Sequence, residues 1–233
     1  MDNKIVSIVC CVIILVLLII ENVKTTDDNK NPDMVQYSLP QEQDEELSQF
    51  DPPLNHPIVI PDYIKNIGFD ATDIEVITGY PELLDGRVKT LHPKIHSSIL
   101  ADRGNKNHIQ DLKKFELEAI DLVVCNLYPF SDSVLKNKNN KYCIENIDIG
   151  GITLLRGAAK NYEYVTVVTD YSQYEEVINN FLKNDGYSTY DFRLDMAHKA
   201  FDYTSNYDLE ISKWFSKINK KDFTKATING EKF

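Results

Sequence analysis

Short strand-like segments alternate with helical segments from residue 57 to residue 218 of this chain. The strand patterns cover residues 58–60, 73–77, 122–125 and 165–169. The helical patterns cover residues 62–67, 106–115, 150–160, 172–182 and 192–218. Strands that are joined through helices pair in parallel, because the connection must return from one end of the sheet to the other. The chain is therefore predicted to be an α/β protein with one mostly parallel sheet and helices on both faces.

The composition sets the size of the domain and excludes one class of partner. With 233 residues, 42% of them hydrophobic, the chain can bury a full-sized core, which we assign to residues 57–218. The formal net charge is −11, so no basic surface for a nucleic acid is expected. A small anionic ligand is still compatible with this charge, because basic side chains gather in one short stretch. They are Arg87, Lys89, His92, Lys94 and His96.

The N-terminal segment has a different character. Residues 5–20 are almost continuously apolar and follow Lys4, which is typical of a signal peptide or a short membrane anchor. A buried strand is the structural alternative. We predict that residues 1–25 direct secretion, or that residues 5–20 contact a membrane if they are not cleaved.

Two further segments are predicted to lack a fixed fold. Residues 26–56 contain many Asp and Glu residues, several prolines and few aliphatic residues. Such a segment cannot bury enough apolar surface to offset the entropy of ordering, so it is predicted to be an acidic disordered linker. Residues 219–233 are predicted to be a flexible tail.

Three blocks of sequence contain the residue types of an active site. They are Thr78-Gly-Tyr-Pro-Glu-Leu-Leu-Asp-Gly-Arg-Val-Lys-Thr-Leu-His-Pro93, Cys125-Asn-Leu-Tyr-Pro-Phe130 and Ile147-Asp-Ile-Gly-Gly-Ile-Thr-Leu-Leu-Arg-Gly-Ala-Ala-Lys-Asn161. The basic residues of the first block could hold a phosphate or polarise a carbonyl oxygen, although a solvated loop would have the same pattern. Asp148-Ile-Gly-Gly151 precedes a helix whose first N–H groups could receive an anion, or it is a simple turn.

Two other side chains in these blocks also have simple structural interpretations. Tyr128 could be a packed aromatic residue with a satisfied hydroxyl, and Lys160 could interact with the dipole at the end of its helix. However, ligands of open parallel sheets bind at the carboxyl ends of the strands, and the block around Tyr128 follows a predicted strand directly. The pattern therefore leaves both interpretations open for each residue taken singly.

Together, the three blocks resemble the IMP cyclohydrolase domain of the bifunctional purine-biosynthesis enzymes. The resemblance continues through residues 165–168 and the segment Lys199-Ala-Phe-Asp-Tyr-Thr-Ser-Asn-Tyr-Asp208. It implies a methylglyoxal-synthase-like fold. It also implies ring closure of a formamido-imidazole-carboxamide ribonucleotide to IMP with loss of water, without a metal or an organic cofactor.

The resemblance also implies roles for particular residues. Catalytic roles fall on Lys89, Tyr128, Asp148 and Lys160, which are expected to line one cleft at the carboxyl edge of the sheet. Substrate-binding roles fall on Arg87, Thr90, Asn126, Gly150 and Gly151.

The sequence departs from the family pattern in ways that affect function. The two N-terminal loops that hold the substrate phosphate in the family have no counterpart here, so the domain is predicted to be incomplete at its N-terminus and weak in turnover. No segment resembles the transformylase domain, and Gly157 and Tyr162 replace the family's usual Ala and His. Two hypotheses follow: a cyclohydrolase, or a secreted or anchored protein that binds a ligand with weakened catalysis. A cytoplasmic location and a homodimer, as in the family, are also compatible with the sequence.

Overall fold

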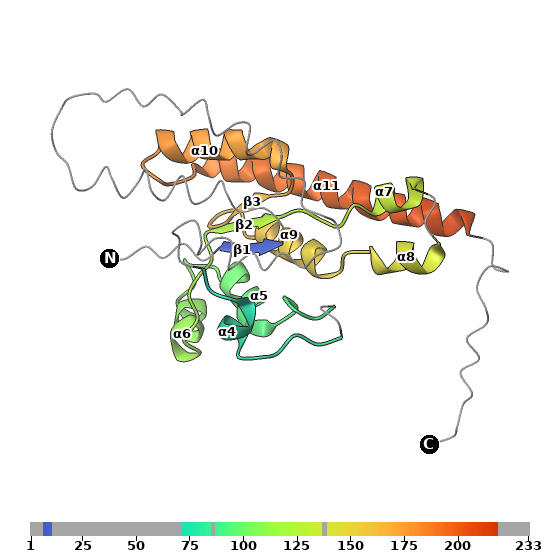
Figure 1. Ribbon diagram of the computed structural model, residues 1–233. Helices are drawn as coiled ribbons and strands as arrows, with labels where there is room; N and C mark the ends of the chain where they lie inside the picture. Colours follow the sequence, from blue (N-terminus) through green and yellow to red (C-terminus); the bar gives the residue numbers. More distant parts are fainter. Residues whose placement is uncertain (1–6, 11–70, 85–86, 137–138, 219–233) are drawn as a thin grey trace, which may run out of the picture.

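The computed structural model describes residues 7–10, 71–84, 87–136 and 139–218 (Figure 1). The predicted linker 26–56 and the predicted tail 219–233 lie outside the described residues. The predicted strand 58–60 and the predicted helix 62–67 also lie outside them.

The described strands form one parallel sheet in the order β1-β2-β3. They are β1 (Ser7–Cys10), β2 (Leu122–Cys125) and β3 (Thr166–Val168). Every residue of β2 and β3 is buried, as expected for strands of a parallel sheet that is covered by helices. The prediction of a parallel α/β architecture is confirmed. The strands predicted at residues 122–125 and 165–169 correspond to β2 and β3.

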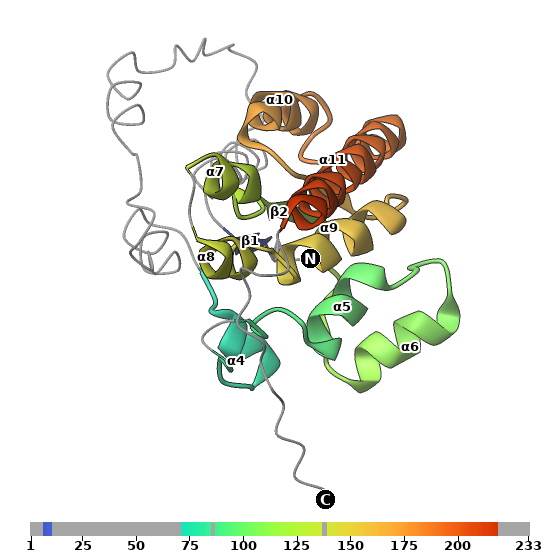
Figure 2. The same cartoon turned by 90° about the vertical axis from the view of Figure 1, so that its right-hand side faces the viewer.

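Helices surround this sheet (Figures 1 and 2). They are α4 (Ile74–Thr78), α5 (Pro93–Leu100), α6 (Lys106–Lys114), α7 (Phe130–Leu135), α8 (Asn140–Glu145), α9 (Gly150–Lys160), α10 (Tyr174–Lys183) and α11 (Tyr190–Lys217), with a 3-10 turn, η1 (Tyr171–Gln173), before α10. Helix α9 packs against β2 and β3, and α11 packs against β3 and α9. In Figure 1, α10 and α11 lie above the strands, on the side of β3, and α4, α5 and α6 lie below them, on the side of β1.

The segment 73–77 was predicted as a strand, and this prediction is wrong, because the segment belongs to helix α4. Its alternating pattern is too short to separate a strand from a helix. Ile74 and Ile77, which are three positions apart, both pack against the core, whereas Val76 is 73% exposed. Gly79 then ends the helix in the left-handed conformation, with φ of 68°.

Strand β1 comes from the apolar N-terminal segment. Val9 lies opposite Val124 of β2, in a parallel register that extends from Ser7 to Cys10. A buried strand was the structural alternative for residues 5–20, and residues 7–10 form such a strand beside β2. Within the described ranges, no helix has the length and apolar character that crossing a membrane requires. Secretion or membrane anchoring stays a prediction from the sequence.

Helix α11 is the longest element and carries part of the core. Thr189 caps its N-terminus by accepting a hydrogen bond from the Phe192 N–H at 3.3 Å. Its buried residues recur at helical spacing: Met196, Ala197, Ala200, Thr204 and Tyr207. This face brings the C-terminal part of α11 against the turn that precedes α9.

Candidate functional site

The carboxyl group of Asp148 joins two of the sequence blocks. Its side chain is buried, with only 8% of the residue exposed. Oδ1 accepts a hydrogen bond from the Gly151 N–H at 2.6 Å, and Oδ2 accepts one from the Tyr128 N–H at 3.4 Å. Asp148 therefore ties the turn before α9 to the segment that follows β2, at the carboxyl edge of the sheet.

The surroundings of Asp148 suit it for proton transfer. Burial raises the pKa of its carboxyl, and the two hydrogen bonds from Gly151 and Tyr128 oppose this rise without cancelling it. A carboxyl with a raised pKa holds a proton at a higher pH than an exposed aspartate does. Such a group can act as a general acid or base under milder conditions than an unperturbed one.

The first turn of α9 also contacts the first sequence block. A Cβ atom on Gly150 would lie 2.9 Å from Oγ1 of Thr90. A Cβ atom on Gly151 would lie 2.7 Å from Oδ2 of Asp148 and 2.7 Å from Cδ2 of Leu127. Glycine at these two positions lets Thr90, Asp148 and the β2 segment approach the helix closely. All three sequence blocks thus meet at the N-terminus of α9.

Asn126 and Tyr128 follow the end of β2, as predicted. Oδ1 of Asn126 accepts a hydrogen bond from the hydroxyl of Tyr174 at 3.0 Å, so its amide is held by α10. Tyr128 has 58% of its surface exposed, although its backbone N–H is bound to Asp148. Its ring therefore faces solvent next to a fixed backbone.

The two cations of the first block are both engaged by carboxylates. Lys89 Nζ lies 3.2 Å from Glu82 Oε2, and Arg87 forms an ion pair with Glu145. These side chains are between 39% and 64% exposed. Ion pairs at such exposure contribute little, about 0–1 kcal/mol, so an anionic ligand could displace either carboxylate at small cost.

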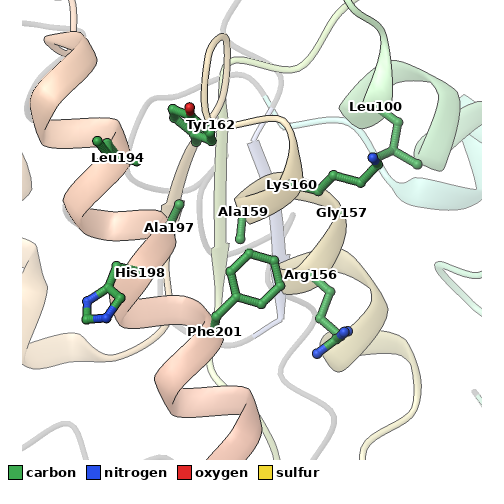
Figure 3. Close-up of a pocket in the computed structure, with 10 residues that line it drawn as sticks. All are labelled: Leu100, Arg156, Gly157, Ala159, Lys160, Tyr162, Leu194, Ala197, His198 and Phe201. Carbon is green, nitrogen blue, oxygen red and sulfur yellow. The ribbon is translucent and has the colours of Figure 1, made fainter.

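Lys160 lies at the opposite end of α9 from Gly150. The helix contains 11 residues, so its ends are separated by about 15 Å along the axis at 1.5 Å per residue. Lys160 lines an open groove between α5, α9 and α11, and its side chain extends toward Leu100 (Figure 3). Arg156, His198 and Phe201 line the same groove. Lys160 and Asp148 therefore lie near opposite ends of α9, and one cleft shared by all four catalytic candidates stays a prediction.

Two tyrosines of α11 belong to the site, although sequence analysis gave them no role. The hydroxyl of Tyr207 accepts a hydrogen bond from the Asp148 N–H at 2.9 Å and donates one to the Asn146 carbonyl at 3.1 Å. The pKa of Tyr203 is raised by burial and then by nearby negative charges, which include Asp170 and Asp148. The available signal was the spacing of these residues, because positions 203 and 207 lie on one helical face within the 199–208 segment.

The described residues contain no group of three or more His, Cys, Asp or Glu side chains that could hold a metal ion. The chemistry of this site, as far as the described residues show it, consists of a buried carboxyl, backbone N–H groups at a helix N-terminus, exchangeable cations and tyrosine hydroxyls. This set can orient a polar ligand, stabilise a developing negative charge and move protons.

Comparisons with known proteins cover most of the described domain. The MGS-like domain family matches residues 61–153, and the AICARFT/IMPCHase bienzyme family matches residues 158–232. The bifunctional purine biosynthesis protein PurH of Dinoroseobacter shibae is 44% identical over 153 residues, which are 66% of this chain and 29% of that protein. PurH of Chlorobium chlorochromatii is 46% identical over 168 residues, which are 71% of this chain and 32% of that protein.

Among solved structures, the crystal structure of ForH superposes with a TM-score of 0.55 and 30% sequence identity. The match covers 66% of this chain and 80% of ForH. By contrast, the chain spans about three-tenths of the length of the curated relatives named above.

Proposed function

The chain belongs to the family of MGS-like IMP cyclohydrolase domains, and we propose that it closes a formamido-imidazole-carboxamide ribonucleotide to IMP. One observation carries this proposal: the three sequence blocks, which are far apart in the chain, meet around the buried carboxyl of Asp148. The relatives named as purine biosynthesis proteins support the same substrate class. The ligand is accordingly a purine-precursor ribonucleotide, and no organic cofactor takes part.

The reaction joins the carboxamide nitrogen to the formyl carbon and expels the formyl oxygen, while the formamido nitrogen becomes doubly bonded to that carbon. The carboxamide nitrogen attacks the formyl carbon, and the formyl oxygen first becomes an oxyanion. That oxygen then leaves as water, with protons that come from the two nitrogens of the substrate. Catalysis therefore needs the two reacting atoms to be held together, the oxyanion to be stabilised and protons to be moved.

The described residues divide these tasks in the proposal. Asp148 moves protons, since its carboxyl is buried and has a raised pKa. Tyr128 shares this role because the family resemblance assigns it, and its backbone N–H holds the Asp148 carboxyl. Lys89 stabilises the oxyanion once the ion pair between Lys89 and Glu82 is broken. The substrate-binding residues are Arg87, Thr90, Asn126, Gly150 and Gly151. Lys160 stands outside this centre in a single chain, because it lies at the far end of α9.

A second candidate function is a binding protein with weakened catalysis. It is favoured by the state of the two cations, since Arg87 and Lys89 are already paired with Glu145 and Glu82. The sequence also lacks the phosphate loops of the family. Contacts to an unreactive phosphate help to hold the reacting atoms in place, so their loss lowers rate as well as affinity. For this reason we expect turnover below the common enzyme range of ~1–10³ s⁻¹.

The decisive experiment is a spectrophotometric assay of ring closure with the full chain. The full chain is needed because β1, which pairs with β2, lies within the first 25 residues. We expect slow turnover that Asp148→Asn abolishes. Asp111→Asn is the matched control, since Asp111 lies on the exposed side of α6, and it should leave the rate unchanged.

The outcomes separate the two candidates. Absence of turnover together with saturable binding of the ribonucleotide would favour the binding protein. Absence of both turnover and binding would reject the proposed substrate class. Equal loss of rate in Asp148→Asn and Asp111→Asn would show that Asp148 has no special role.

A further inference from the structure

We propose that Tyr207 is a positioning residue that holds the Asp148 turn in its working geometry. The role of Asp148 in ring closure rests on the proposed function, whereas the structural contact does not. The Tyr207 hydroxyl accepts a hydrogen bond from the Asp148 N–H at 2.9 Å and donates one to the Asn146 carbonyl at 3.1 Å. One oxygen atom on α11 thus bridges both sides of the turn that leads into α9.

Only a neutral hydroxyl can make both bonds. It has one hydrogen to donate to Asn146 and lone pairs to accept from Asp148, whereas a phenolate could only accept. Burial raises the pKa of Tyr207 to about 12, so the hydroxyl stays neutral at physiological pH. The other titratable groups whose charges act on Tyr207 are Asp148, Tyr203 and Asp208. The bridge is therefore intact over the whole pH range in which Asp148 would act.

Packing fixes the place of the Tyr207 ring. The residue is only 8% exposed, and its ring meets that of Phe130 edge to face, with centroids 6.3 Å apart. Phe130 begins α7, two residues after Tyr128. A single tyrosine consequently contacts the segment after β2 through its ring and the turn before α9 through its hydroxyl. These are the same two segments that the Asp148 carboxyl joins.

The hydrogen bonds of the Asp148 carboxyl differ in their tolerance of movement. The bond from Gly151 is short at 2.6 Å, whereas the bond from Tyr128 is 3.4 Å, near the limit for a hydrogen bond. A small displacement of the turn would break the Tyr128 bond first. Because that bond stabilises the charged carboxylate, its loss raises the pKa of Asp148 further. If the Tyr207 hydroxyl is removed, the backbone N–H of Asp148 loses its partner, and this loss favours such a displacement.

The test is a carboxyl ¹³C NMR titration of the full chain labelled at aspartate, with the Asp148 signal assigned through Asp148→Asn. In Tyr207→Phe, the pKa of Asp148 should rise above its value in the unsubstituted chain. The matched control is Tyr190→Phe on the same helix, which removes a hydroxyl that lies 3.0 Å from the hydroxyl of Tyr162. In this control the Asp148 titration should not change. Turnover in Tyr207→Phe should fall by up to about a hundredfold through kcat, the loss that a misplacement of about 1 Å can cause.

The titration and the assay fail in different ways. If the unsubstituted chain has no turnover, the proposed function fails, and the titration alone decides whether Tyr207 positions Asp148. An unchanged pKa of Asp148 in Tyr207→Phe, or an equal shift in Tyr190→Phe, overturns the inference. If Tyr207→Phe is too unstable to purify, both tyrosine variants are measured in the Gly157→Ala background, which the packing around Gly157 predicts to be more stable.

Discussion

The two ends of α9 carry residues from the same sequence block but are built in opposite ways. At the N-terminus, Gly150 and Gly151 have no room for a side chain, and the Asp148 carboxyl is buried against them. At the C-terminus, a Cβ atom on Gly157 would meet only ordinary contacts, the nearest at 3.5 Å from Ile99. There, Lys160 faces an open groove. One end is thus closely packed around a carboxyl, and the other is loosely packed beneath a cation.

This difference shows what a family resemblance does and does not provide. The resemblance assigns Asp148 and Lys160 to one active site, because both stand in matching sequence blocks. Of these two residues, Asp148 is the one around which the structure packs polar groups closely. In a single chain, therefore, a matching motif identifies candidate residues, but packing decides which of them can act together.

The largest expected effect on stability comes from Gly151→Ala. The added methyl group would lie 2.7 Å from both Asp148 Oδ2 and Leu127 Cδ2, so both side chains must shift. Overpacking of this kind costs about 1–3 kcal/mol, and we expect a loss of that size in the free energy of unfolding, measured by urea denaturation. An unchanged stability would mean that the N-terminal end of α9 is no tighter than the C-terminal end, and the contrast would disappear.

The second effect concerns pH and the burial of Asp148. Its pKa is raised in the folded state above the ordinary value of 3.8. At a pH below 3.8 the carboxyl is neutral in both the folded and the unfolded state. As the pH rises, the unfolded chain ionises first, so the folded state loses stability until the pH passes the raised pKa. Asp148→Asn removes this dependence. We therefore expect the stability of the variant to improve relative to the unsubstituted chain as the pH rises through this range.

Urea denaturation at a series of acidic pH values measures this difference. Asp111→Asn serves as the control and should show a constant offset, since Asp111 is exposed. A constant offset for Asp148→Asn as well would indicate that the carboxyl is hydrated in solution. The N-terminal end of α9 would then be open to water, as the C-terminal end is.

Strong patterns in the sequence predicted most of the fold. The apolar run of β2 and the long helical spacing of α11 are each unambiguous, so their type and place could be predicted. Residues 73–77 were too short for their period to decide between strand and helix. The strand from Ser7 to Cys10 could not be separated from a signal peptide, because a continuous apolar run suits both.

The candidate site was predicted in part, for equally physical reasons. Gly150 and Gly151 open a helix, and Tyr128 follows a strand. Both features of the sequence place these residues at the same edge of the sheet. The separation of Lys160 could also have been foreseen, since ten positions along one helix amount to about 15 Å. The contact between Tyr207 and Asp148 could not, because it depends on where α11 crosses the turn, and no local pattern encodes a crossing point.

The smallest effect, and opposite in sign, is expected for Gly157→Ala at the loose end of α9. The new methyl group would lie 3.5 Å from Ile99 Cγ2 and 3.9 Å from two atoms of Leu100, which are ordinary van der Waals distances. Gly157 lies within an α-helix, where alanine is favoured over glycine by about 1 kcal/mol. We expect the free energy of unfolding to increase by about 0.5–1 kcal/mol in urea denaturation.

Gly79→Ala is the matched control. It should destabilise the chain, because Gly79 has a φ of +68° that alanine adopts only with strain. A loss of stability in Gly157→Ala would show that the groove closes over this position in solution, and the two ends of α9 would then be packed alike.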